Sequence, residues 1–177
     1  MANEMIKTAN NNEDLFSKVS ALIEQTRSYV KTSVNTAEVY TKYYIGKYIV
    51  EYEQKGNIRA QYGKQVIKDL SQKLTERFGT GWSYPSLKNI KQFYLTYAER
   101  LNTDFSVEPQ KANQWLANSK TDEHQIFNLS WSHYLILMRV ENPDARSFYE
   151  IECVQQQWSK RQLCRQVGSC LYERLAL

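Results

Sequence analysis

The stretch Trp158-Ser159-Lys160-Arg161-Gln162-Leu163 gives the clearest local indication of structure in this chain. Its serine can accept a hydrogen bond from the open N–H groups of a helix's first turn, and the glutamine three residues later completes a capping box. The tryptophan before the serine and the leucine after it have the spacing of a hydrophobic staple. The stretch therefore predicts a helix that begins at Ser159, and its apolar pattern continues to about Leu175.

The same Trp-Ser pair occurs at 82–83 and 131–132, with Leu87 and Ile136 at the staple position. Two of the three pairs follow another predicted helix after a short break, and the helices that come next carry outward basic residues. That order is typical of a helix-turn-helix. The alternative is a small bundle of three well-capped helices. At the first pair Pro85 leaves open whether Ser83 or Tyr84 is the cap, because the residue before a proline avoids the α conformation.

The composition narrows the class of protein. The 177 residues suffice for one large domain or two small ones. No apolar run reaches the roughly 18 residues of a membrane helix, and the N-terminus has no secretory pattern. Three cysteines, an odd number, predict reduced thiols in a cytoplasmic protein. Neither histidine lies at ligand spacing from a cysteine pair, so neither a metal nor another cofactor is predicted.

Positive charge is concentrated in two segments. Residues 55–101 hold 9 basic and 3 acidic side chains, and residues 158–177 hold 4 basic and 1 acidic, whereas the whole chain has a net charge of +4. Both segments contain the second half of a predicted helix-turn-helix. Clustered Lys and Arg indicate a polyanionic partner, and the alternative is a solvated basic face.

Hydrophobic periodicity predicts a mainly α fold with helix-turn-helix or winged-helix-like units. A polar tail at 1–11 is expected to be disordered, and a Tyr-rich helix at 36–54 either continues the first helix or follows a break near Asn35. Residues 102–127 are irregular, and a short β wing around 102–130 is one alternative. We expect 12–101 and 102–177 to form one compact domain. The predicted helices are 12–34, 36–54, 63–78, 83–101, 132–140, 143–157 and 159–175.

In a helix-turn-helix, the N-terminal residues of the second helix face the base edges, and neighbouring cations contact phosphates. Asn and Gln can pair with adenine, and Lys can reach guanine or phosphate. The first unit is the stronger candidate, because its preceding helix is also basic. The predicted DNA-binding residues are Lys64, Lys68, Tyr84, Ser86, Lys88, Asn89, Lys91, Gln92, Lys160, Arg161 and Arg165.

Two other patterns resemble catalytic motifs, but neither has the residues that a catalytic site needs. Asp144, Glu150 and Glu152 have the order of a PD-(D/E)xK nuclease motif, but no lysine follows two residues after either glutamate. Asp144 is also explained as a first-turn acid of a helix. Ser132 beside His133 is better explained as a helix cap than as a catalytic pair. No catalytic residue is therefore predicted.

Most of residues 40–175 resembles the N-terminal domain of the YhcG-like, DUF1016 family of bacterial proteins. The last of the matching stretches is the most specific. Tyr43, where many relatives have Trp, is a mild departure. The stretches are Tyr44-Ile45-Gly46-Lys47 through Ile49-Val50-Glu51, RAQYGKQVIKDLSQKLTERFGTGWS, SLKNIKQFYLTY and LSWSHYLILMRVENPDARSFYEIECVQQQWSKRQLCRQVGSCLYERL.

The resemblance implies a winged-helix or helix-turn-helix DNA-binding domain that precedes a PD-(D/E)xK nuclease domain, in proteins of mobile-element or defence systems. The chain is then expected to be either part of a longer protein or a free-standing version, without nuclease activity of its own. Together with the basic segments, this predicts a targeting module for double-stranded DNA, with homo-oligomerisation and the nuclease domain as further partners. The alternative is a protein-interaction or oligomerisation module that uses the Tyr-rich helix 36–54.

Overall fold

The computed structural model describes residues 2–55, 60–101 and 126–175, and all of its regular structure is helical. The predicted mainly α fold is confirmed, and no strand occurs among these residues. Most of the segment suggested for a β wing, 102–125, lies outside the described residues, as does the connector 56–59. The helices are α1 (Ala2–Lys55), α2 (Ala60–Phe78), α3 (Tyr84–Leu101), α5 (Trp131–Leu137), α6 (Pro143–Gln155), α7 (Lys160–Gly168) and α8 (Leu171–Leu175).

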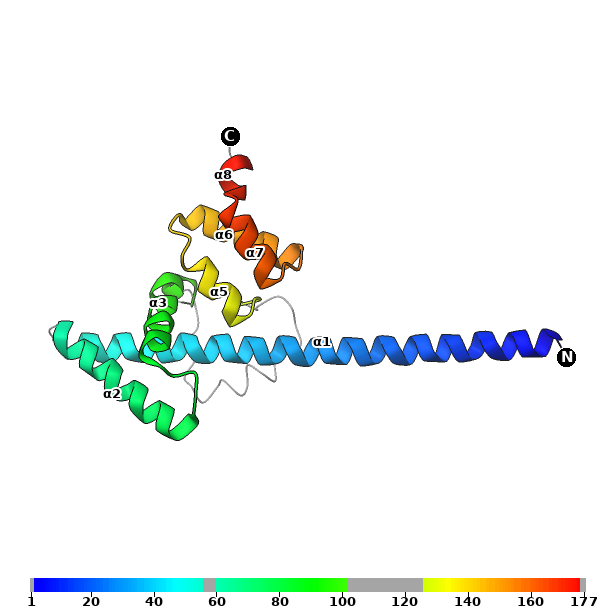
Figure 1. Ribbon diagram of the computed structural model, residues 1–177, viewed down its shortest axis with the longest axis horizontal. Helices are drawn as coiled ribbons and strands as arrows, with labels where there is room; N and C mark the ends of the chain where they lie inside the picture. Colours follow the sequence, from blue (N-terminus) through cyan, green and yellow to red (C-terminus); the bar gives the residue numbers. More distant parts are fainter. Residues whose placement is uncertain (1, 56–59, 102–125, 176–177) are drawn as a thin grey trace.

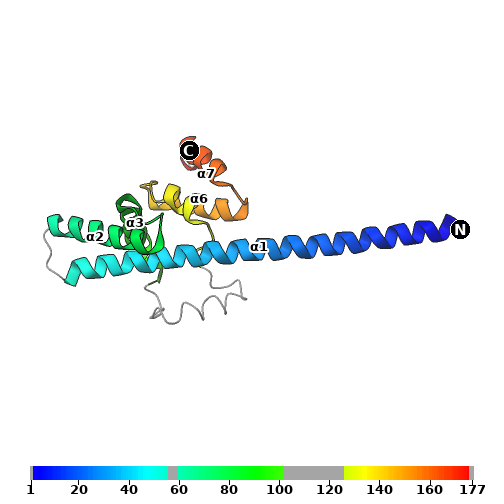
Figure 2. The ribbon, with the colours of Figure 1, turned by 60° about the horizontal axis from the view of Figure 1, so that its bottom comes forward.

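Helix α1 is one unbroken rod, and the other helices gather around its C-terminal half (Figure 1). The suggested break near Asn35 is absent, so the helix predicted at 12–34 and the Tyr-rich segment 36–54 are the same helix. Residues 2–11 are also helical, where the polar composition predicted a disordered tail. Figure 2 shows that the remaining helices lie on one side of this rod. None of the described helices is long and apolar enough to cross a membrane.

The closest helix crossing joins α1 to α3 at Gly46. A Cβ atom placed on this glycine would lie 2.5 Å from the backbone oxygen of Ile90 and 2.7 Å from Cβ of Tyr94. Only a residue without a side chain allows the two backbones to approach so closely. The crossing brings Tyr43 of α1 within 5.1 Å of the ring of Tyr94, in an edge-to-face arrangement.

The main core is an aromatic cluster at this crossing. Phe93 is fully buried, and its ring centroid lies 5.0–5.3 Å from those of Tyr97, Phe127, Trp131 and Tyr134. Such tilted and edge-to-face contacts add to the free energy of burying the rings. The cluster joins α1, α3 and α5, and it continues into α6 and α7 through other buried residues, which are Ala145, Tyr149, Cys153 and Leu163.

A second, smaller cluster holds α2 against α1 and α3. Ile49 of α1, Ile67 of α2 and Leu87 of α3 are buried together, and Trp82 packs against them from the turn. Trp82 therefore packs against the cluster that contains Leu87, as the staple predicted at the first Trp-Ser pair requires. Ser83 caps α3, since its hydroxyl lies 3.4 Å from the N–H of the third residue onward.

The second Trp-Ser pair does not start a helix in the predicted way. Helix α5 begins at Trp131 itself, with Ser130 as the cap residue, so Trp131 is the first helical residue and cannot staple onto Ile136. Its indole instead packs edge-to-face on Phe93, and the Lys42 ammonium lies 4.9 Å from the ring centroid. Tertiary packing of the indole therefore replaces the local staple here.

The last two predicted helix starts agree with the structure. The Asn142 side chain accepts hydrogen bonds from the N–H groups of Asp144 and Ala145, with Pro143 in the first helical position. Ser159 and Gln162 form the predicted capping box. The predicted helix 159–175 is interrupted, however. Helix α7 ends at Gly168 and α8 begins at Leu171, because Cys170 adopts a left-handed conformation with φ of 51°.

Candidate nucleic-acid interface

The first helix-turn-helix unit consists of α2, a turn with two glycines, and α3. Gly79 and Gly81 both have positive φ values, 81° and 106°, which glycine adopts without steric cost. Gly79 is the predicted helix terminator, and its N–H donates to the carbonyl of Thr75 at 3.0 Å. This turn directs α3 back across α1, so one face of α3 is buried and the opposite face is open to solvent.

The open face of α3 carries three of the residues predicted to read bases, namely Lys88, Asn89 and Gln92. They lie at helical spacing on one side, and all three are exposed. Two other residues that were predicted to contact DNA are less exposed to solvent. Tyr84 is half-buried against the second cluster, and Ser86 is half-buried beside its capping serine. The exposed set is therefore smaller than predicted.

Lys91 has a structural partner that the sequence did not indicate. Its ammonium forms an ion pair with the carboxylate of Glu53, which lies near the end of α1. The side chains of the two residues are only 29% and 20% exposed. This pair ties α3 to α1, so Lys91 is a weaker candidate for phosphate contact than its charge suggests.

Helix α2 presents its predicted cations to solvent. Lys64, Lys68 and also Lys73 are exposed, with Lys64 and Lys68 close together and Lys73 about 140–180° around the helix from them. Two acidic residues of this helix are held by neighbouring glutamines, with Gln65 donating to Asp69 at 2.8 Å and Gln72 donating to Glu76 at 2.9 Å. Within the described part of the chain, none of the three lysines forms an ion pair.

The second unit consists of α6, a short turn and α7. The turn passes through Gln157, whose φ of 50° is left-handed. The N–H of Trp158 donates to the carbonyl of Cys153 at 3.1 Å, and the N–H of Gln157 donates to that of Val154 at 3.4 Å. These two bonds are those of a Schellman motif, which ends a helix and reverses the chain.

His133 of α5 fixes the same turn from the outside. Its Nε2 lies 3.0 Å from the Trp158 carbonyl oxygen and its Nδ1 lies 2.7 Å from the Ser130 hydroxyl. A carbonyl oxygen can only accept, so Nε2 carries the proton and Nδ1 accepts from the serine. Ser130, not Ser132, is thus the histidine's partner. The buried Cys153 thiol donates weakly to the same carbonyl, and burial raises its pKa to about 11.

This histidine makes a testable prediction about pH. Burial lowers the pKa of His133 below its usual value, and the positive charges of Lys160 and Lys31 lower it further. The unfolded chain therefore binds a proton more readily than the folded one. His133 contributes its full stability above about pH 6.5 and loses it as the pH falls below that value, with a slope of no more than about 1.4 kcal/mol per pH unit.

Urea unfolding at pH 7.5 and at pH 5.5 measures this effect, with His133→Gln as the comparison. We expect the free energy of unfolding to fall less in the variant than in the parent over this range. The two proteins differ at this position alone, so the contributions of all other groups cancel in the difference. Identical falls in the two proteins would show that His133 is not the titrating group.

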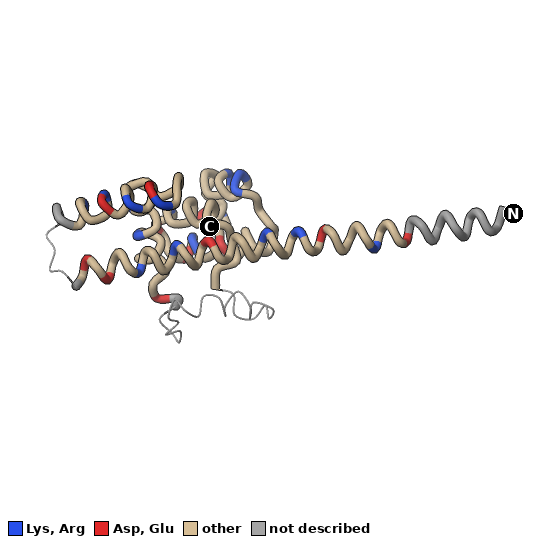
Figure 3. The backbone as a smooth tube through the Cα atoms, turned by 90° about the horizontal axis from the view of Figure 1, so that it is seen from below, with Lys and Arg blue, Asp and Glu red and all other residues tan. Residues whose placement is uncertain are grey.

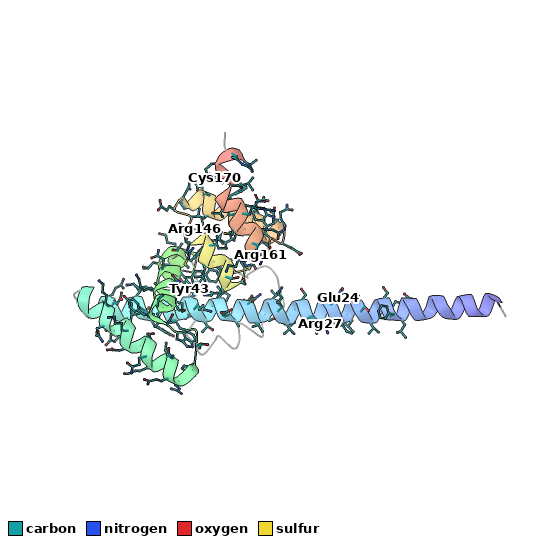
Figure 4. The ribbon with its side chains drawn as sticks, in the orientation of Figure 1. Glu24, Arg27, Tyr43, Arg146, Arg161 and Cys170 are labelled. Carbon is teal, nitrogen blue, oxygen red and sulfur yellow. The ribbon has the colours of Figure 1, made fainter. Side chains whose placement is uncertain are left out.

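The outer face of α7 is the most strongly basic helical surface described. Lys160, Arg161 and Arg165 are exposed and lie on one side of this nine-residue helix, while Leu163 on the other side is fully buried. The helix contains no acidic residue. Within the described residues none of the three cations forms an ion pair, and Figure 4 places Arg161 on α7.

The cation-bearing helices of the two units are α2 and α7. In the view of Figure 3 both lie above α1, whereas in Figure 1 α2 lies below α1 and α7 lies above it. Six of the seven cations on these two helices, all but Arg77, are termed the basic set below, together with Lys88 of α3. The six are Lys64, Lys68, Lys73, Lys160, Arg161 and Arg165.

The carboxylates that suggested a nuclease motif have other roles here. Glu150 is 8% exposed and accepts a hydrogen bond from the Tyr134 hydroxyl at 3.1 Å. Asp144 lies in the first turn of α6, where its charge complements the helix dipole. No group of three or more His, Cys, Asp or Glu side chains in the described ranges is placed to hold a metal ion.

Sequence reasoning missed Glu53 and His133 as residues that shape this interface. Glu53 is separated from Lys91 by 38 residues, and His133 from the Trp158 carbonyl by 25. No local spacing links such pairs. The excess of basic residues at 55–101 was the one available signal for such a partner. A segment with excess positive charge favours an ion pair with an acidic residue from another part of the chain.

Comparison with known proteins assigns the class of this domain. Residues 18–174 match the family model described as the DUF1016 N-terminal domain, and the chain belongs to this family. One curated relative is the Escherichia coli (strain K12) protein named "Putative nuclease YhcG", which is 38% identical over 166 residues. The match covers 88% of this chain and 44% of that protein, so the chain spans less than half of the relative's length. No solved structure matches.

Proposed function

We propose that this domain binds duplex DNA and positions a nuclease domain on it. The observation that carries the proposal is the basic set, in which exposed cations from both helix-turn-helix units have no ion-pair partner among the described residues. The curated relative is named as a nuclease and extends well beyond the matched region. A DNA-positioning domain is the partner that such an enzyme needs.

Binding would rest mainly on phosphates. Cations without ion-pair partners can neutralise phosphates, and each neutralised phosphate releases condensed counterions. The open face of α3 adds Asn89 and Gln92, which have the hydrogen-bonding groups for adenine edges. Affinity for the backbone would thus come from both units, and base contacts from α3.

The alternative of a protein-interaction surface on the Tyr-rich segment 36–54 loses support. Tyr43 is 3% exposed and belongs to the aromatic core. Tyr40 and Tyr44 are half-buried and pack against the same core. Only Tyr48 and Tyr52 remain largely exposed, at 47% and 57%. Most of these tyrosines therefore hold the fold together.

The test is the affinity for a labelled duplex and its dependence on salt. We expect the double variant Arg161→Ala, Arg165→Ala to bind roughly a hundredfold more weakly, since a hydrogen bond to a charged group contributes about 1.5–3 kcal/mol. The slope of log affinity against log salt should become shallower by about 2. Fluorescence anisotropy at several salt concentrations measures both quantities.

The matched control is Lys18→Ala, Arg27→Ala, which removes the same charge from exposed positions in the N-terminal half of α1, away from both helix-turn-helix units. This variant should retain most of the affinity. Equal losses in the two variants would indicate non-specific attraction to a cationic protein. Parent-like binding by the α7 variant would contradict a role for the second unit, and an unshifted duplex at low salt would refute the proposed function.

A further inference from the structure

Residues 15–34 of α1 carry a long apolar stripe that the rest of the described protein leaves uncovered. Figure 1 shows the N-terminal half of α1 projecting beyond the other helices. The eight large apolar side chains of the stripe are between 46% and 73% exposed. They are Leu15, Phe16, Val19, Leu22, Ile23, Tyr29, Val30 and Val34.

The stripe has the periodicity of a helix-pairing face. Its members recur at alternating steps of three and four residues, with Thr26 and Ser33 at the two polar positions of the repeat. At about 100° per residue they occupy about 140° of the helix circumference. That arc is wide enough for the buried face of a paired helix.

Charged residues border the stripe rather than interrupt it. Lys18 and Asp14 form an ion pair at 2.6 Å along one edge, and Arg27 lies along the other. Figure 4 shows Glu24 and Arg27 on this uncovered part of α1. With two acidic and three basic residues between 14 and 34, the segment is nearly neutral, so two copies of it would not repel each other.

An isolated helix of this kind is unstable in water. Helix formation without tertiary contacts is marginal, and three of the apolar residues here are the β-branched valines 19, 30 and 34, which are weak helix formers. The continuous helix in the structure therefore needs a partner along its apolar stripe.

We infer that the partner is a second copy of this chain, which pairs its own stripe 15–34 with this one. Each exposed side chain of the stripe offers roughly 100 Å², so two copies would bury about 1,600 Å² in total. This is the size of a standard stable protein interface. The roughly 800 Å² of apolar surface on one copy, left open, would exceed the largest apolar patch of a typical monomer, about 300–600 Å².

The molecular mass in solution tests this inference without DNA. Sedimentation equilibrium of the full chain at about 100 μM, which exceeds the micromolar dissociation constants of the weaker interfaces of this size, should give twice the chain mass of 20.9 kDa. Leu22→Glu should give the single-chain mass at the same concentration. Leu22 is 64% exposed and outside both core clusters, so the variant should keep the near-ultraviolet circular dichroism of the aromatic core.

The matched control is Ser28→Glu, which places the same charge on the opposite, exposed side of the same helix. This variant should remain dimeric. A parent chain that sediments as a monomer would overturn the inference, because the stripe would then belong to another partner. A dimer that survives Leu22→Glu would also overturn it, because the interface would lie elsewhere.

Discussion

Phe93→Ala is expected to lower the free energy of unfolding by about 3–5 kcal/mol, the usual cost of removing a buried aromatic ring together with the cavity that it leaves. The ring is fully buried, and its four nearest aromatic neighbours come from α3, α5 and the residues just before α5. These rings cannot all move inward at once. We therefore expect little relaxation and a fall in Tm of roughly 10 °C or more.

Leu95→Ala on the same helix is the control for this prediction. Leu95 is 50% exposed, so its truncation should change the free energy of unfolding by no more than about 0.5 kcal/mol. Urea unfolding followed by near-ultraviolet circular dichroism compares the two variants. Similar, small losses in both would show that the aromatic cluster is not the centre of the core.

Gly46→Ala should also destabilise the protein, by roughly 1–3 kcal/mol, although alanine favours helix formation by about 1 kcal/mol over glycine. The added Cβ would meet the backbone oxygen of Ile90 at 2.5 Å. A backbone atom inside a helix cannot move alone, so α3 would have to shift away from α1. That shift would loosen the packing of the buried α3 residues against α1.

Gly168→Ala makes the same chemical change, but we expect it to stabilise the protein. A Cβ at this position meets no atom within 4 Å, so the preference of alanine for helix should raise the free energy of unfolding by up to about 1 kcal/mol. Thermal unfolding of both variants should give shifts of opposite sign. A stabilising shift for Gly46→Ala would mean that the crossing of α1 and α3 is looser than described.

The sequence predicted those residues of the candidate interface whose exposure depends only on the apolar pattern of their own helix. Lys88, Asn89 and Gln92 are exposed on α3 because the apolar residues between them define the buried side of the helix. Lys160, Arg161 and Arg165 are exposed on α7 for the same reason. Lys91 could not be placed in this way, since its ion pair depends on how α3 lies across α1.

The sequence by itself determined most of the helices, their caps and the two turns. Ser83, Asn142 and Ser159 act within three residues of their own positions, and Gly79 ends α2 through its own backbone, so no distant contact was needed. The mainly α class followed from the apolar periodicity, which sets the buried side of each helix before any of them meet.

Only the tertiary structure decided the start of α5, the crossing at Gly46 and the roles of His133 and Glu53. Each depends on a partner that is distant in sequence, as Trp131 packs on Phe93 and His133 on the turn before α7. The continuity of α1 belongs here as well. Local preferences leave the region around Asn35 balanced between helix and break, and packing of Val39, Tyr40 and Tyr43 on its C-terminal side against other helices favours the helix, since helix stability in proteins comes mainly from such contacts.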